Sequence, residues 1–527
     1  MKRLQTGNIL IFCLAVFLFF GLLIGGGQNA SSATLSKTNA ANTESIAEYL
    51  DFNPETTYLH NYCYMAILKG TWYEMGTQYA KQCPDAIKRN IADKLGANLT
   101  NWGSIESMYE VIDEYEAMLD FFPGYIDFCH GIADGLGIAY EDVFISMITL
   151  GVPDDACAAA SAWGDATGNG EVYAAIHSDS PHQPNYFHPG IIMYPDDGNA
   201  FISYTGFTNA YMNEKGLCCM FTYGFGLAEG DIKKGLPICI GGLYNAVYSN
   251  TAAEAVDKHI KLCRVGSGEI AHYVDSSGDA YVLETTARHY AVRKSGDNGE
   301  IDYLLQSNSY LTEEMQLSGG NTDDNIYRYD SIDQYLKENF GSITIDVLRN
   351  ALSNTSYYNK VTDEWIYEWD LTTGEWSPER KATRSGCAMR RVFNLSRLTS
   401  YILMGSEYDL VSKVPYSLGT YSKVTLDDNP YTTLNNSANE VRLQLWYASR
   451  DIEAAKKSGE DITQRMEYFN IAREALYQGT NYQALGLIAN NASEQLELYA
   501  QGLSLLNKAQ CYAKAAQSGD VADLIDY

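Results

Sequence analysis

Residues 154–167 read DDACAAASAWGDAT, and the chemistry of this stretch centres on its cysteine, Cys157. A glycine-rich turn follows at 168–170, and a second strand-like run leads to Asp179. If the Ala156–Cys157 bond is cut, Cys157 gains a free α-amino group beside its own thiol. The thiol is then a nucleophile and the amine is its base, both in one residue. Since an α-amino group titrates near ~7.7–8.0, this amine is suited to act as a base close to neutral pH.

A purely structural interpretation of Cys157 competes with this one. Free cysteine is among the most buried residue types and usually packs as a small apolar side chain. The chain holds 11 cysteines, so one cysteine alone does not indicate catalysis. Without Cys13 and Cys157 nine remain, and their spacing shows no disulfide framework. The catalytic interpretation therefore depends on the residues that accompany Cys157.

The order of the predicted elements indicates an α+β protein. Residues 74–147 follow a helical pattern that Pro123 interrupts. After Cys157, strand-like runs alternate with Gly and Asn turns, and strands are predicted at 172–176, 191–194, 200–204, 217–223, 270–275, 279–285, 289–294 and 302–307. Further helices are predicted at 237–248, 251–263, 325–339 and 343–353. This order favours sheets covered by helices over a doubly wound parallel sheet.

The two ends of the chain differ from this middle part. Residues 1–33 place two basic residues before an apolar run and small residues, which is typical of a secretory signal. An uncleaved N-terminal membrane anchor is the alternative. Residues 34–57 are predicted to form a linker, and the helical pattern of 437–515, which has no strand signal, predicts a hairpin or bundle.

The composition limits the classes of partner. The chain has 527 residues, and 66 acidic against 37 basic residues give a net charge of −29. Nucleic acid and anionic membrane surfaces would repel such a protein, so neither is expected as a partner. Membrane contact is expected only through the possible N-terminal anchor, and the rest of the chain is expected outside the cytoplasm. The oligomeric state is not indicated.

Six motifs, in order along residues 58–425, carry a resemblance to a known family. They are KGTWYEMG at 69–76, the segment 122–137, Cys157 with 162–170, YMNEKGL at 211–217, QSNS at 306–309 and YRY at 327–329. Together they resemble the penicillin acyltransferase-like family of N-terminal-nucleophile hydrolases and, more distantly, the choloylglycine (bile-salt) hydrolases.

The resemblance implies a fold and an activity. The implied fold is a four-layer αββα sandwich, in which residues 58–156 form an α chain and 157–430 a catalytic β chain. The implied reaction hydrolyses an N-acyl amide bond or transfers its acyl group, without a cofactor or metal. Residues 431–527 lie beyond the match and are expected to be a helical extension.

Four residues match catalytic positions of the family. Cys157 would attack the substrate carbonyl and carry the acyl group as a thioester, and Asp179 would hold the new α-amino group. Asn308 would donate a side-chain N–H to the substrate or the oxyanion. Arg328 would neutralise a carboxylate near the nucleophile. Taken alone, Asp179 and Asn308 also fit ordinary turn residues, and Arg328 fits a solvated arginine at the start of a helix.

Other positions depart from the family pattern. The arginine of the bile-salt branch is replaced by Ile176, and the common asparagine beside it by His177, which becomes a candidate substrate contact. The oxyanion asparagine expected after 211–217 falls on Thr222 and Tyr223. Either the Tyr223 phenol or a nearby backbone N–H is expected to donate in its place.

The remaining signals are weaker. His177, His182 and His188 are irregularly spaced, so loop histidines are favoured over a metal site. The substrate is expected to be a small N-acyl compound. Two alternatives stay open: a phospholipase-B-like or dipeptidase-like hydrolase of the same superfamily, and a non-catalytic exported binding or scaffold protein. The mass of the mature protein would discriminate between a cut enzyme and an intact scaffold or zymogen.

Overall fold

The computed structural model describes residues 65–519 with internal gaps. The gaps are residues 85–86, 89, 93, 96–104, 149–155, 180–189, 205–209, 225–234, 263–267, 318–322, 353, 355, 368, 371–374, 377–386, 404–420 and 428. The predicted signal or anchor at 1–33 and the linker at 34–57 lie outside the described residues, as do His182 and His188.

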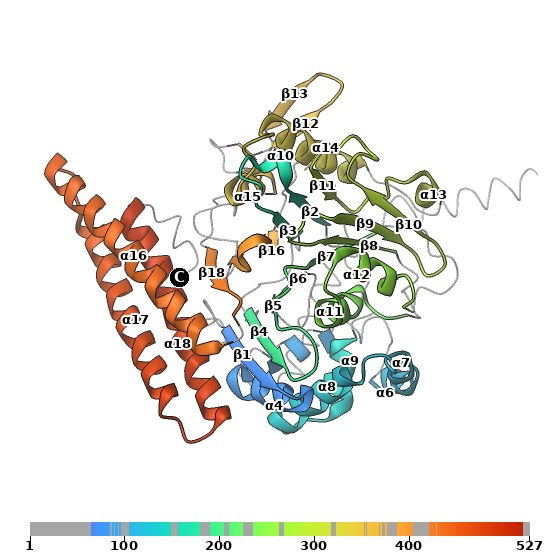
Figure 1. Ribbon diagram of the computed structural model, residues 1–527, viewed down its shortest axis with the longest axis horizontal. Coiled ribbons are helices and arrows are strands. Elements are labelled where there is room, and N and C mark those ends of the chain that lie inside the picture. The colour runs from blue at the N-terminus through green and yellow to red at the C-terminus, as the bar shows by residue number, and fades with distance from the viewer. Residues whose placement is uncertain are drawn as a thin grey trace, which may run out of the picture.

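Two large sheets form the centre of the described part (Figure 1). The eight-stranded sheet has the order β1 (Met65–Gly70), β4 (Gly190–Pro195), β5 (Phe201–Tyr204), β6 (Ala210–Asn213), β7 (Cys218–Tyr223), β8 (Glu269–Val274), β9 (Ala280–Thr285) and β10 (Tyr290–Lys294). The six-stranded sheet has the order β11 (Tyr303–Gln306), β2 (Ala156–Ala162), β3 (Tyr173–Asp179), β16 (Cys387–Asn394), β17 (Thr399–Leu403) and β18 (Tyr421–Thr425). Strands β1 and β4 pair in parallel, and every other described pair in the two sheets is antiparallel.

Helices and two small hairpins complete the described elements. The hairpins are β12 (Ser356–Asn359) with β13 (Glu364–Tyr367), and β14 (Trp369–Asp370) with β15 (Glu375–Trp376). The helices before the C-terminal region are α4 (Trp72–Gln82), α6 (Ile105–Tyr109), α7 (Ile112–Met118), α8 (Pro123–Leu136), α9 (Tyr140–Met147), α10 (Gly164–Thr167), α11 (Ile238–Tyr248), α12 (Ala252–His259), α13 (Glu313–Gln316), α14 (Asp323–Glu338), α15 (Ile345–Ala351) and the 3-10 turn η1 (Leu395–Arg397).

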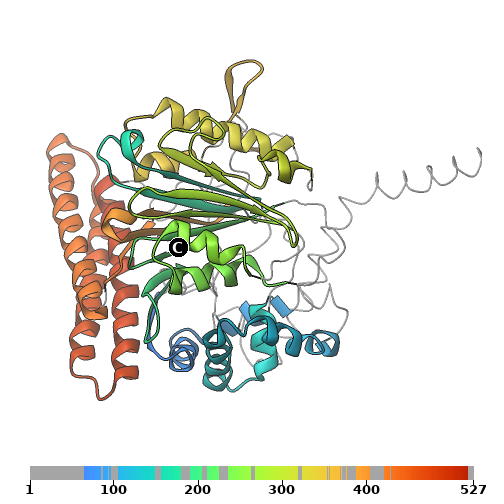
Figure 2. The same cartoon turned by 45° about the vertical axis from the view of Figure 1, so that its right-hand side comes forward.

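The sheets lie face to face, and each carries helices on its outer face (Figure 2). Apolar side chains of both sheets fill the layer between them, among them Ile67, Ala159, Ile176, Ile202, Met220, Ile270, Val282 and Leu304. Helices α4, α8, α9, α11 and α12 pack on the outer face of the eight-stranded sheet. Helices α14 and α15 pack on the outer face of the six-stranded sheet. Because both faces of β2 are buried, its run of alanines needs no polar alternation.

Local residues set the bounds of the helices α4 and α8. Thr71 caps α4 by accepting from the Glu74 N–H, and the Glu74 side chain accepts in return from the Thr71 N–H. Pro123 lies at the start of α8, where its missing N–H costs no helical hydrogen bond. Gly137 ends α8 in the left-handed conformation, with φ at 69°. The predicted break at Pro123 is therefore confirmed.

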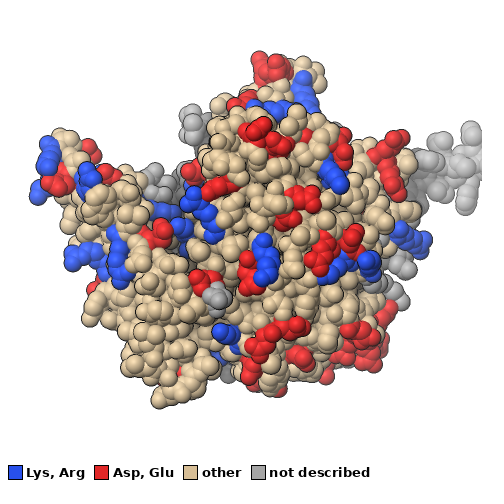
Figure 3. Space-filling model, in the orientation of Figure 1, with Lys and Arg blue, Asp and Glu red and all other residues tan. Residues whose placement is uncertain are grey.

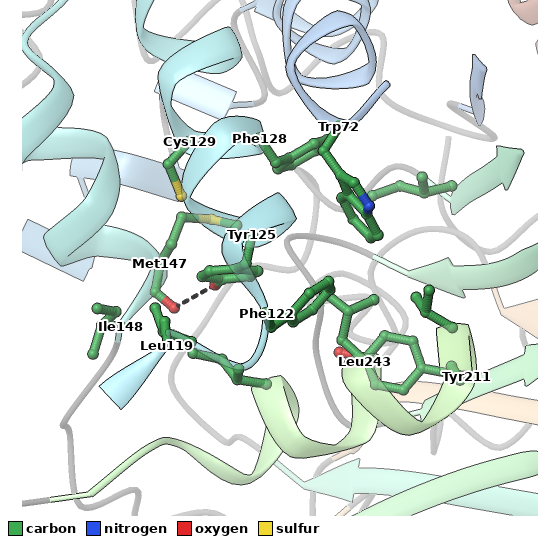
Figure 4. Close-up of a cluster of buried hydrophobic side chains, with 14 of the residues drawn as sticks. Trp72, Leu119, Phe122, Tyr125, Phe128, Cys129, Met147, Ile148, Tyr211 and Leu243 are labelled. Atoms are coloured by element: carbon green, nitrogen blue, oxygen red, sulfur yellow. Dashed lines mark hydrogen bonds between the residues drawn. The ribbon is translucent and has the colours of Figure 1, made fainter. Parts of the chain in front are cut away.

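Helices α4 and α8 cross at two glycines, Gly76 of α4 and Gly131 of α8. A Cβ atom on Gly131 would lie 2.1 Å from the Tyr73 carbonyl oxygen, so the backbones approach too closely for any larger residue. The crossing seals an aromatic core in which the Tyr125 hydroxyl donates to the Met147 carbonyl at 3.0 Å (Figure 4). Through this core α8 and α9 pack against the eight-stranded sheet.

Three long helices form the C-terminal region: α16 (Pro430–Ser458), α17 (Thr463–Leu487) and α18 (Ala492–Ser518). They stand together beside the sheets (Figure 1). The Met65 N–H on β1 donates to the Ser504 hydroxyl of α18 at 3.2 Å. Leu503 and Leu506 of α18 are fully buried in the core between the sheets. The predicted helical character of 437–515 is confirmed, and the helices also close one end of the inter-sheet layer.

The sequence did not predict β1, β6 or any of the strands from β12 to β18. Within the predicted helical pattern of 74–147, two short helices, α6 and α7, precede Pro123. Among the described residues, no helix combines the length and the apolar content that a membrane crossing requires. Acidic side chains gather over the region of α6–α9 at the lower right of the molecule (Figure 3).

Candidate active site

Cys157 is the second residue of β2, and its side chain is only 3% exposed. Strand β2 lies between β11 and β3 in the six-stranded sheet. Since successive side chains of a strand point to opposite faces, Cys157 shares a face with Ala159, which packs in the layer between the sheets. The nucleophile predicted from the sequence therefore faces the buried inter-sheet layer.

Asn308 contacts Cys157 directly. Its Oδ1 accepts a hydrogen bond of 2.7 Å from the main-chain N–H of Cys157. Its Nδ2 donates to the main-chain carbonyl of Tyr223, also at 2.7 Å. Asn308 is 1% exposed, and it bridges the head of β2 in one sheet to the end of β7 in the other. The structure thus brings together Cys157 and Asn308, two residues that the sequence assigned to one site.

Tyr223 reaches the site through its main chain. Strand alternation places its side chain on the face of Phe221, which packs against the helices. Thr222 points to the inter-sheet layer instead, and its hydroxyl donates to the Ser307 carbonyl at 3.1 Å. The alternation of β7 places the Tyr223 side chain on the face away from Cys157, and a donor role for its phenol stays a prediction.

His177, a candidate substrate contact, lies on the face of β3 that points away from the inter-sheet layer. It shares the face of Tyr173 and Ala175, which pack against α14 and α15, and it is fully buried there. Cys157 faces the opposite side of the same sheet. His177 and Cys157 therefore lie on opposite faces of the six-stranded sheet, and substrate contact by His177 stays a prediction.

Asp179 is the last residue of β3, and its main chain pairs with that of Ala156. Cys157 pairs with Ser178 in the same register. The backbone of Asp179 therefore lies opposite the residue that precedes the nucleophile. The side chains of Asp179 and Ala156 lie outside the described part of the structure.

Arg328 belongs to α14, the helix that covers the outer face of β2 and β11. It is 6% exposed, so it is not the solvated arginine of the alternative interpretation. The layer that it occupies is on the other side of the sheet from the face of Cys157. Its proposed role beside the nucleophile is a prediction that needs a functional test.

Several polar groups of the inter-sheet layer were missed by the sequence analysis. The Ser161 hydroxyl and the His272 Nε2 atom are 2.7 Å apart and join β2 to β8 across the layer. Burial, with the nearby Arg293 as a second cause, lowers the pKa of His272 to about 3. Glu284, Arg293 and Glu300 form a second buried group. The sequence signal for this group was the presence of Glu284 and Arg293 inside predicted strands, since charged residues are rarely buried.

Two hollows of the described surface are lined by residues of β18, α16 and α17. A groove of about 480 Å³ runs between α16 and α17, and a smaller one lies between β18 and α16. Neither groove is lined by a residue of the candidate site. Within the described residues, no three His, Cys, Asp or Glu side chains gather closely enough to hold a metal ion.

Comparisons with known proteins give matches only among solved structures. No protein-family profile matches the chain, and a search of curated proteins gives no significant match. The chain is similar to the structure of penicillin V acylase from Agrobacterium tumefaciens, with 17% identity and a TM-score of 0.32, over 47% of this chain and 83% of that one. It is also similar to a mutant of conjugated bile acid hydrolase from Clostridium perfringens, with 12% identity and a TM-score of 0.31, over 51% of this chain and 98% of that one. A second variant of that hydrolase has 12% identity and a TM-score of 0.24, over 52% of this chain and 90% of that one. Identities and TM-scores this low carry no inference about the chemistry, which rests on the residues of this chain.

Proposed function

We propose that this chain is a self-processing cysteine hydrolase or acyltransferase that acts on an N-acyl amide bond through Cys157. The observation that supports this proposal most directly is the 2.7 Å hydrogen bond from the Cys157 main-chain nitrogen to Asn308 Oδ1. That nitrogen is the atom that becomes the α-amino base once the Ala156–Cys157 bond is cut. A side chain already holds it beside the thiol, at the buried head of a strand.

The proposed fold is the four-layer αββα sandwich of N-terminal-nucleophile hydrolases. Two facing sheets with helices on both outer faces, and a nucleophile strand inside the six-stranded sheet, support it. In this proposal the cut leaves residues 58–156 as an α chain, and the β chain begins at Cys157. Export through the segment 1–33 is part of the proposal.

Self-cleavage follows from the same thiol. Cys157 Sγ attacks the Ala156 carbonyl carbon, the C–N bond breaks, and the nitrogen takes the thiol proton. Water then hydrolyses the thioester, which leaves a carboxylate on Ala156 and a free thiol and amine on Cys157. The main-chain pairing of Ala156 with Asp179 supports a role for this aspartate beside the bond that we expect to be cut.

Turnover repeats this chemistry on a substrate. The α-amine takes the thiol proton as Sγ bonds to the substrate carbonyl, and it returns the proton to the departing amine. Water, or another nucleophile in a transfer reaction, then gives its proton to the α-amine as its oxygen or nitrogen bonds to the acyl carbon; the C–S bond breaks, and the α-amine passes the proton to the departing Sγ, which restores the thiol. The amide nitrogen of Asn308 carries two hydrogens, and the Tyr223 carbonyl takes one of them. The second hydrogen is a donor for the oxyanion, which supports the role predicted for Asn308.

The direct test is the mass and N-terminal sequence of the purified full chain. We expect two fragments that meet at Ala156–Cys157, and one intact chain for Cys157→Ala. Cys511→Ala is the matched control, since Cys511 is equally buried but belongs to α18, and this variant should still be cut. Incubation with a panel of N-acyl amides should add an acyl mass to the Cys157 fragment. A wild type that turns over these amides while it stays uncut would refute the proposal, and an intact, inactive wild type would favour a scaffold.

A further inference from the structure

Asn308 lies in the middle of a short connection between two regular elements. Strand β11 ends at Gln306, and the next helix, α13, begins at Glu313. The residues between them belong to neither element, so the regular hydrogen bonds of a strand or helix do not fix their position. Nevertheless Asn308 must hold Oδ1 at hydrogen-bond distance from the Cys157 nitrogen. Other contacts therefore have to place the segment 305–312.

Two buried charged side chains hold the two ends of this segment. At one end, Arg293 Nη2 donates to the Leu305 carbonyl at 2.5 Å. At the other end, Glu284 accepts from the Leu311 N–H at 2.9 Å, the Thr312 N–H at 3.1 Å and the Thr312 hydroxyl at 2.7 Å. Asn308 lies between these two anchors.

The two anchors belong to one network. Arg293 Nε lies 3.8 Å from Glu284 Oε1, and Arg293 Nη1 donates to Glu300 Oε1. Tyr329, which follows Arg328 on α14, also donates to Glu300 Oε1, at 2.5 Å. Glu284, Arg293 and Glu300 are 1%, 3% and 0% exposed. Hydrogen bonds are strong in such a dry environment, and the loss of one partner there is costly.

We propose that Glu284 and Arg293 are positioning residues that hold Asn308 against the nucleophile. The inference rests on the proposed function, because it assigns the network a role in the reaction of Cys157. Neither residue touches the reacting atoms; each acts through the main chain of the segment 305–312. A displacement of about 1 Å in a group that contacts the nucleophile can cost ~100-fold in rate, so such anchors set the rate without any contact to the substrate.

A merely structural role for the network has to be separated from a positioning role. Glu171 offers a matched carboxylate, because it also accepts three hydrogen bonds, from Tyr173 at 2.8 Å, Asn394 at 2.9 Å and Arg397 at 2.5 Å. It precedes β3, at the end of that strand opposite to Asp179. Glu171→Gln should therefore lower stability without displacing Asn308.

The first measurement is hydrogen–deuterium exchange of the full-length chain, with Cys157→Ala in every sample so that cleavage does not contribute. The Glu284→Gln side chain keeps one oxygen and presents an NH₂ group, so the Leu311 or the Thr312 N–H loses its acceptor. Exchange across 305–312 should be faster than in the parent and unchanged by Glu171→Gln. If Glu284→Gln does not fold, Thr312→Val removes only one donor and should give a smaller increase.

The second measurement is steady-state kinetics in the Cys157 chain. Glu284→Gln should lower kcat by about tenfold or more and change KM by less than about twofold, since substrate binding is kept while the reacting geometry is lost. Glu171→Gln should leave kcat unchanged.

The possible outcomes distinguish a failure of this inference from a failure of the proposed hydrolase or acyltransferase function. Faster exchange together with a lower kcat supports the positioning role. Unchanged exchange, or faster exchange with a wild-type kcat, overturns it. A wild type that neither cleaves itself nor turns over any N-acyl amide overturns the proposed function, and the exchange result alone then decides whether Glu284 holds the Asn308 segment.

Discussion

At the scale of single residues, the site is defined by an amide that joins two sheets. Asn308 contacts Cys157 across 151 residues of sequence and contacts the β7 carbonyl of Tyr223 with its other end. Both bonds use the planar amide in one orientation, in which the oxygen faces the main-chain N–H and the NH₂ faces the carbonyl. An aspartate at this position would lose the donor, and a leucine would lose both contacts. The residue type is therefore explained by its two partners.

Asp179→Asn is the prediction that belongs to this scale. The substitution keeps the shape of the side chain and removes its negative charge. We expect this charge to hold the α-amino group of Cys157, because Asp179 pairs with the preceding residue, Ala156. We expect kcat/KM to fall by about 100-fold, the range of an acid–base contribution, with a comparable melting temperature. Steady-state kinetics and thermal melts of the two purified proteins measure this. Wild-type kcat/KM in the variant would remove Asp179 from the mechanism.

At the scale of elements, strand alternation separates the candidate residues. Cys157 and Ser161 on β2 face the inter-sheet layer, whereas His177 on β3 faces the helices. The Ser161–His272 pair ties β2 to β8, four residues along the strand from the nucleophile. Because His272 is buried and close to Arg293, its imidazole stays neutral in the folded protein. The pair therefore joins the two sheets with a neutral hydrogen bond.

This neutral imidazole makes stability depend on pH. The pKa of His272 is about 3 in the folded chain against 6.5 for the ordinary group, so the unfolded chain binds the proton first as the pH falls. The stabilising contribution is present above about pH 6.5 and is lost between there and about pH 3. Between about pH 7 and about pH 5 it should account for up to about 2 kcal/mol of the free energy of unfolding.

His272→Gln removes the titrating group and keeps a polar side chain beside Ser161. Urea unfolding at the two pH values should show a smaller pH dependence in the variant than in the wild type. Equal pH dependence in both proteins would show that His272 is not buried in its neutral form.

At the scale of the whole molecule, the C-terminal helices are part of the main body. Leu434 of α16 and Leu496, Leu503 and Leu506 of α18 share the core between the sheets. Lys81 of α4 forms a 2.8 Å ion pair with Glu497 of α18. The boundary predicted at 431–527 separates regions by sequence pattern, while the apolar contacts cross it. No residue of the candidate site lies in these helices, so their effect on the reaction is expected to run through stability.

Removal of this region should therefore expose the inter-sheet core. A chain that ends at Asn435 is expected to be insoluble or to unfold without cooperativity.

Leu503→Ala is the milder change: it should cost about 2–5 kcal/mol of stability through the cavity it leaves, and cleavage at Cys157 should persist. Leu487→Ala is the matched control, since Leu487 is 55% exposed and should change stability by less than about 0.5 kcal/mol. A truncated chain that melts as the full chain does would make the helices a separate domain.

The sequence by itself determined the features that depend on near neighbours. The ends of α8 at Pro123 and Gly137, and the strands around 191–194 and 279–285, follow from residues that act within one turn or one strand. Cys157 as a nucleophile is a prediction of the same local kind, because its proposed base, the α-amino group, belongs to the same residue.

Only the tertiary structure decided what depends on distant segments. The pairing of β1 with β4, the three strands β16–β18 and the face of His177 are set by partners far along the chain, which local periodicity does not contain. The buried group of Glu284, Arg293 and Glu300 has the same origin, since a charge enters a core only when distant groups supply its hydrogen bonds. The meeting of Asn308 with Cys157 is likewise a product of two sheets packed face to face, and no local property of either residue determines it.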